Sequence, residues 1–229
     1  MKKLLSITLT GVTALFLSAC AAVTNSQAGK NTIAKLPEPL KSQFQAISRQ
    51  QEELGKQYTA GTRKMLEAYA LIADSVGLKV QAAKLRAESQ ALNSGSSLED
   101  SRKAFSKSSS IIKEVQSKIS KSNGVTVASK ETFTAGVRAK NEAYITEATL
   151  AANASIVAAK GIQAIKSASM MEKAVLTTSL DPLFYFSKDI PRFLAQEREF
   201  DTACQKYALD YQIKLPKVSL PTPKINVAF

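Results

Sequence analysis

The chain has 229 residues, a net charge of +12 and two cysteines, and it contains neither histidine nor tryptophan. Without histidine it cannot build a Ser-His-Asp triad, a Cys-His pair or a His-ligated metal site. Carboxylate pairs and Ser-Lys dyads remain possible, but no motif points to them. We therefore expect a protein that is not an enzyme and holds no metal.

The first 19 residues have the layout of a signal peptide. Lys2 and Lys3 form a basic start, and residues 4–16 are apolar apart from Ser and Thr. That apolar run is shorter than the ~20 residues that a membrane-spanning helix needs. A basic start, a short apolar run and small residues before a cut are typical of a cleaved secretion signal.

The segment Leu17-Ser18-Ala19-Cys20 closes this signal and resembles the lipobox of bacterial lipoproteins. The resemblance covers the first 20 residues only. It implies cleavage before Cys20, a diacylglycerol on the Cys20 thiol and a third acyl chain on its amine, and several chains anchor a protein stably. This lipid is the one cofactor expected. The residue after the cysteine is Ala21 and not Asp. In a Gram-negative cell this resemblance implies sorting to the outer membrane, with the protein facing the periplasm. A Gram-positive source would place the anchor on its single membrane.

The mature chain would keep a net charge of +10, because cleavage removes Lys2 and Lys3. A basic protein favours anionic partners such as acidic lipid head groups, wall polymers or acidic proteins. The expected location argues against nucleic acid. Residues 20–37 are small, polar and unpatterned, so we expect a flexible lipidated tether there.

Apolar residues recur at helical spacing from Pro39 to Val76. Gly55 and Gly61 lie within this run, so the spacing predicts one long helix or two helices with a bend. Gly77 is a candidate break, and a shorter helix is expected over 78–92.

A third helix is predicted between a capping box at Ser96–Glu99 and a stop at Asn123-Gly124. Its apolar stripe contains Leu98, Phe105, Ile112, Val115 and Ile119. The opposite face carries four lysines that could contact an anionic surface, and a merely solvated face is the favoured alternative. These lysines are Lys103, Lys107, Lys118 and Lys121.

The longest pattern predicts a helix of about 50 residues over 129–178, with an a/d seam of alternating larger and small residues. A second apolar face on this helix predicts that neighbours contact it from two sides. The seam comprises Leu150, Ala154, Val157, Gly161, Ala164, Ala168, Met171 and Val175; the second face comprises Ile145, Ala152, Ile156 and Ala159.

Two Asp-containing segments before prolines, Asp181-Pro182 and Asp189-Ile190-Pro191, predict helix starts, the second opening a final helix over 190–213. Cys204 lies on the aromatic stripe of this helix and is expected to be a buried thiol. Phe184, Tyr185 and Phe186 form an aromatic cluster. It could contact a partner or a membrane, and filling one end of the bundle is the favoured alternative.

The tail, residues 214–229, contains three prolines and is expected to be extended. Apolar residues alternate along it, so it could add to a partner as a strand, lie in a groove, or wrap over its own helices. The tail residues singled out as possible partner contacts are Val218, Leu220, Ile225, Val227 and Phe229.

The sequence thus predicts an all-α, elongated helical bundle over 38–213 with coiled-coil-like helices, a flexible N-terminal tether and an extended tail. The function expected is that of a membrane-anchored envelope lipoprotein that scaffolds or recruits other envelope proteins, or associates with itself. Two alternatives stay open: a binder of lipid or another amphiphile, and a protein that binds anionic membrane or cell wall.

Overall fold

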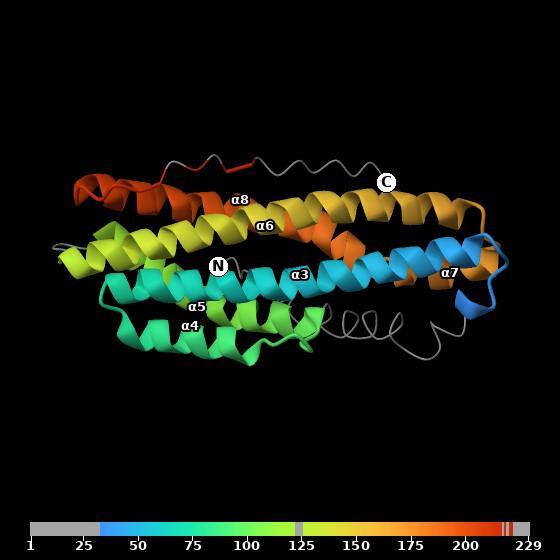
Figure 1. The fold of residues 1–229 in the computed structure, drawn as a ribbon, viewed down its shortest axis with the longest axis horizontal. Coiled ribbons are helices and arrows are strands. Elements are labelled where there is room, and N and C mark those ends of the chain that lie inside the picture. Colours follow the sequence, from blue (N-terminus) through green and yellow to red (C-terminus); the bar gives the residue numbers. More distant parts are fainter. Residues whose placement is uncertain (1–32, 122–125, 217, 219, 222–229) are drawn as a thin grey trace, which may run out of the picture.

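The computed structural model describes residues 33–121, 126–216, 218, 220 and 221. This part of the chain is an elongated bundle of α-helices (Figure 1), which confirms the predicted fold class. None of its helices is both long and apolar enough to cross a membrane. The helices are α3 (Leu40–Ser75), α4 (Lys79–Ala91), α5 (Leu98–Lys121), α6 (Val127–Lys166), α7 (Met170–Ser179) and α8 (Asp181–Asp210).

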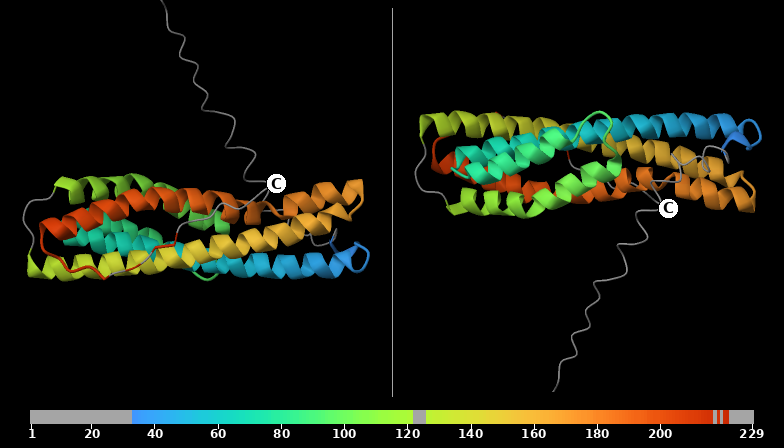
Figure 2. Two further views of the ribbon diagram at one scale, coloured as in Figure 1. Left: turned by 90° about the horizontal axis from the view of Figure 1, so that it is seen from above. Right: turned by 90° about the horizontal axis from the view of Figure 1, so that it is seen from below.

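The two longest helices, α3 and α6, lie side by side and antiparallel. Gly61 of α3 is adjacent to Glu147 of α6, while Gly136, earlier in α6, is adjacent to Ile72, later in α3. α8 packs against α6, and α4 and α5 lie beside the second half of α3 (Figures 1 and 2). Side chains from all six helices meet in one continuous core.

Gly136 allows the backbones of α6 and α3 to approach closely. A Cβ at this position would lie 2.7 Å from Ile72 Cγ1 and 3.0 Å from the Ile72 backbone nitrogen. Those separations are too short for a side chain, so only glycine fits without a shift of one helix.

Replacing Gly136 by alanine should lower the free energy of unfolding by about 1–3 kcal/mol, because overpacking forces the helices apart. Gly55→Ala is the matched control: a Cβ at Gly55 meets nothing within 4 Å. Alanine is the better helix former by about 1 kcal/mol, so Gly55→Ala should not destabilise the protein. Urea unfolding measures both, and a Gly136→Ala variant as stable as the parent would contradict the close approach.

The first helical region is a single helix that ends at Ser75, and of the two roles open for Gly77, a break or a close packing point, the structure shows the break. Gly77 has a φ of +80°, the left-handed conformation in which glycine carries no Cβ strain. The Leu78 N–H donates to the Ala73 carbonyl at 2.9 Å, which satisfies a carbonyl at the helix end. The predicted helix over 78–92 is α4, so the chain reverses between these helices.

The capping box of α5 lies one residue later than predicted. The backbone N–H of Asp100 donates to Ser97 Oγ at 3.1 Å, and the Asp100 carboxylate accepts from the Ser97 N–H at 2.9 Å. Ser96 instead accepts from the Asn93 N–H within the preceding turn. The sequence offers Ser at both positions and an acid three residues after each, so spacing alone did not decide between them.

The prediction of one helix of about 50 residues over 129–178 was wrong, because α6 ends at Lys166 and α7 begins at Met170. Ser169 caps α7 in a capping box with Glu172. That Ser-x-x-Glu signal lies inside the apolar pattern, which continues across the break. The seam residues from Leu150 to Ala168 are buried; the side chains of Met171 and Val175, in α7, lie outside the described residues.

The predicted helix start at Asp189 was also wrong. α8 runs from Asp181 to Asp210 and contains Pro191 in its interior. Pro182 occupies the first turn, as expected, but the residue before the helix is Leu180 rather than Asp181. Proline costs a helix one internal hydrogen bond, and the flanking residues Ile190 and Leu194 are 1% and 0% exposed. Residues before and after Pro191 are therefore packed in the core, and the helix continues through the proline.

The packed part of the chain begins before α3, within the segment expected to be tether. Ile33 and Leu36 are 8% and 5% exposed and belong to the core. Cys20 and residues 20–32 lie outside the described residues.

Candidate functional site

A cluster of ionisable side chains lies in the core where α3, α6 and α8 meet. Tyr69 of α3 donates a hydrogen bond to the Glu197 carboxylate of α8. Lys140 of α6 donates to Asp201 Oδ1 at 3.2 Å. The Lys140 side chain is fully buried, so this ion pair is part of the interior and not of the surface.

Glu147 of α6 is the least compensated member of this core cluster. It is 2% exposed, and its Oε2 has no hydrogen-bond partner among the described residues. Gly61 faces it so closely that a Cβ there would lie 3.3 Å from Glu147 Cγ. Burial, together with the charge of Glu197, raises the pKa of Glu147 from 4.5 to about 8. Glu147 is therefore mostly protonated near neutral pH.

Opposing influences act on Glu197. Burial raises the pKa of this carboxyl, while the Tyr69 hydrogen bond and the Lys140 charge lower it. Burial raises the pKa of Tyr69 well above its usual value of 10, and the Glu197 charge adds to this shift. Tyr69 therefore stays protonated and serves as the donor of the pair.

The core cluster is shielded from solvent. Its members Tyr69, Lys140, Glu147, Glu197 and Asp201 are each at most 9% exposed. A substrate would reach them only if the helices separated. Among the described residues, no group of three or more Cys, Asp or Glu side chains is arranged to hold a metal. The buried acids can thus bind protons in the folded chain and release them when the chain unfolds, which makes the stability of the protein depend on pH.

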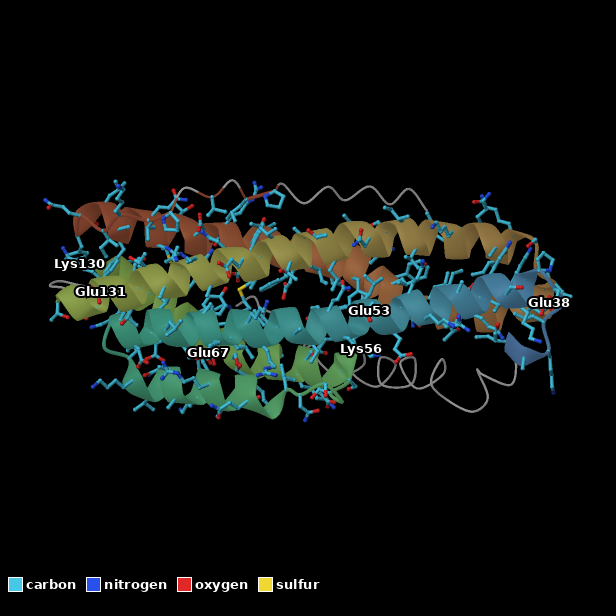
Figure 3. All side chains as sticks on the ribbon, viewed as in Figure 1. Glu38, Glu53, Lys56, Glu67, Lys130 and Glu131 are labelled. Atoms are coloured by element: carbon cyan, nitrogen blue, oxygen red, sulfur yellow. The ribbon has the colours of Figure 1, made fainter. Side chains whose placement is uncertain are left out.

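A surface pocket lies at the start of α6, where Lys130 and Glu131 are seen (Figure 3). It has a volume of about 390 Å³ and lies between α6 and the turn that follows α8. Exposed charged side chains line it, including Arg138 and Lys214.

No protein-family model matches the chain, and neither the curated proteins nor the solved structures yielded a match.

The aromatic cluster joins α8 to α3 and α5. Tyr185 Oη lies 2.8 Å from Tyr58 Oη, and the Arg102 guanidinium lies 4.4 Å above the Tyr185 ring. Phe186 is fully buried, 5.5 Å from the Tyr58 ring. Phe184 and Tyr185 are half-buried. In this conformation a partner could reach only those last two, and their role in partner binding stays a prediction.

The four predicted lysines of α5 are all exposed, opposite the buried residues Ile112, Val115 and Ile119. Lys103 pairs with Glu99 at 3.8 Å and Lys107 with Glu88 at 3.7 Å. Such exposed pairs are weak, so these charges remain available to an anionic surface. Docking of these lysines onto an anionic surface stays a prediction.

The second apolar face of α6 is not covered as predicted. Ile145 and Ile156 are 38% and 56% exposed, and Ala152 and Ala159 are exposed as well. α6 packs against α3 and α8, but these four positions are exposed, so the expectation that a neighbour contacts this second face was wrong. We call these four residues the α6 outer face.

The described part of the tail lies against its own helices. Leu215 and Leu220 pack on the core, and Tyr144 Oη donates to the Pro221 carbonyl at 3.3 Å. Val218 is 38% exposed. The other predicted contacts, Ile225, Val227 and Phe229, lie outside the described residues.

Sequence reasoning did not single out the core cluster, although a signal for it exists. A second row of buried residues, different from the predicted a/d seam, recurs along α6 at alternating spacings of four and three, as in a coiled coil. We call it the inner row. Lys140 and Glu147 occupy two of these positions. An ionisable side chain at such a buried position indicates a buried partner or a shifted pKa of that side chain. The inner row comprises Phe133, Val137, Lys140, Tyr144, Glu147, Ala151, Ala154 and Ala158.

Proposed function

We propose that the protein is a lipid-anchored envelope lipoprotein whose helical bundle scaffolds or recruits other envelope proteins. The observation that carries the proposal is the segment Leu17-Ser18-Ala19-Cys20 behind a basic start and a short apolar run. Its parts stand in the order that lipoprotein processing requires. An anchor at Cys20 places a long bundle next to a membrane, where its surfaces meet other envelope components.

One feature of the core and one of the surface support recruitment over chemistry. The described ionisable side chains that depart most from ordinary behaviour, such as Glu147, are sealed in the core. By contrast, large apolar side chains are exposed on α6, at Ile145 and Ile156, and on the tail, at Val218. Exposed apolar patches bordered by polar residues are typical of protein interaction sites.

The anchor is tested by the mass of the protein purified from its own membranes. We expect a mature chain that begins at Cys20 and carries acyl chains. Cys20→Ser should abolish both processing and acylation. Cys204→Ser is the matched control, because Cys204 is fully buried and burial raises its pKa to about 12, which leaves the thiol unreactive. An unacylated chain cleaved elsewhere would remove the anchor from the proposal.

Binding to an anionic membrane or wall polymer is the second candidate, favoured by the four exposed lysines on one face of α5. It predicts cosedimentation with anionic vesicles that weakens with salt. Charge reversal at Lys118 and Lys121 should reduce binding more than reversal at Lys79 and Lys84, which are exposed on α4. Equal losses would show that overall charge, not the α5 face, decides binding.

A further inference from the structure

The α6 outer face forms one apolar line on the surface. Its members follow each other at intervals of seven, four and three residues, which keeps them on one side of the helix. Two of them, Ile145 and Ile156, are among the exposed large apolar residues of the described chain. A surface helix normally presents polar residues on its solvent side.

The tail approaches this face from the N-terminal end of α6. Ile213 and Lys214 share a pocket with Thr134 and Arg138, near the start of α6. By Pro221 the tail has advanced along α6 to Tyr144 (Figure 1). The next exposed apolar residue in that direction is Ile145, so the tail points along the α6 outer face.

The chain that follows Pro221 is long enough to span this face. Eight residues follow Pro221, and extended they reach about 26–29 Å. From Tyr144 to Ala159 the helix rises about 22 Å. Alternate residues of an extended chain lie about 6.6 Å apart, and Ala152 and Ile156 are separated by about 6 Å along the helix axis.

We propose that residues 222–229 bind the α6 outer face of their own chain. The contact would remove apolar surface of both segments from water. This inference does not rest on the proposed function, because it concerns a contact within one chain with or without a lipid. It adds one consequence: a partner that takes the tail must first displace it from α6.

Site-specific photo-crosslinking tests this contact. Phe229 in the full chain is replaced by p-benzoylphenylalanine, a larger phenylalanine analogue, and the protein is irradiated at low concentration and mapped by mass spectrometry. We expect crosslinks within one chain to the α6 segment from Ala152 to Lys166. Ile156→Asp should reduce their yield about five-fold, since a charge replaces apolar contact area worth about 1 kcal/mol.

Val80→Asp is the matched control, because Val80 is 64% exposed on α4, away from α6. It should leave the crosslink yield unchanged. Circular dichroism melting shows that both variants fold, as expected for exposed positions. Crosslinks between two chains would mean that a second copy occupies the face. That result, crosslinks scattered over several helices, or a yield that Ile156→Asp does not reduce would each overturn the proposal.

Discussion

Replacing Glu147 by glutamine should stabilise the protein at pH 8 by about 3–5 kcal/mol, while leaving its stability near pH 4.5 almost unchanged. The reason is that the pKa of Glu147 is raised from 4.5 to about 8 in the folded protein. Between these two values the folded chain binds more protons than the unfolded chain. Stability therefore falls as pH rises from 4.5 to 8 and levels off above 8. Glutamine is neutral throughout and removes this slope.

Denaturant unfolding of both proteins between pH 4.5 and 9 measures the effect, and the difference between the two curves isolates Glu147 from Glu197, whose pKa is also raised. Glu142→Gln is the control on the same helix, because Glu142 is exposed. It should change stability by less than about 0.5 kcal/mol at every pH. A Glu147→Gln effect that is the same at pH 4.5 and pH 8 would contradict the burial of an uncompensated acid.

Replacing Lys140 by methionine should destabilise the protein by about 3 kcal/mol at pH 7. Methionine keeps most of the buried length of the side chain but removes the charge that pairs with Asp201 at 3.2 Å. Asp201 keeps its hydrogen bond from Gln205 at 2.6 Å, which moderates the loss. The same change removes the charge that lowers the pKa of Glu197.

A double-mutant cycle with Asp201→Asn separates the ion pair from simple packing. If the pair is the cause, the double variant should lose less stability than the two single variants added together. Lys160→Met, at an exposed position of α6, should stay within about 0.5 kcal/mol of the parent. Strict additivity, or a loss at Lys140 no larger than at Lys160, would mean that the buried pair contributes nothing specific.

Much of the fold was predictable because it depends on local periodicity and punctuation. The helical spacing from Leu40 to Ser75 and the glycine at 77 predict α3 and its end. Errors arose where two local signals compete. The apolar pattern runs through Ser169, yet the capping box with Glu172 starts a new helix there. Pro191 looked like a helix start, yet it lies within α8.

The core cluster was less predictable because it depends on how separate helices align. The spacing of the inner row on α6 indicates that Lys140 and Glu147 are buried. It does not tell which residues of α8 they meet, since the axial alignment of two helices follows from the whole packing. Tyr69, Glu197 and Asp201 could therefore not be assigned to the cluster from spacing alone. The four residues of the α6 outer face were identified from the sequence, but their exposure was not, because spacing does not tell whether another helix covers an apolar face.

The proposal that the chain is an envelope lipoprotein that recruits other envelope proteins is tested most directly by cross-linking in the cells that produce it. The lipid anchor is kept intact, and the complexes are purified and identified by mass spectrometry. We predict one or two envelope proteins in fixed ratio to this chain, and a weaker complex when residues 222–229 are deleted. This short deletion leaves Leu215 and Leu220 packed on the core. Recovery of the chain alone, or only with copies of itself, would contradict recruitment.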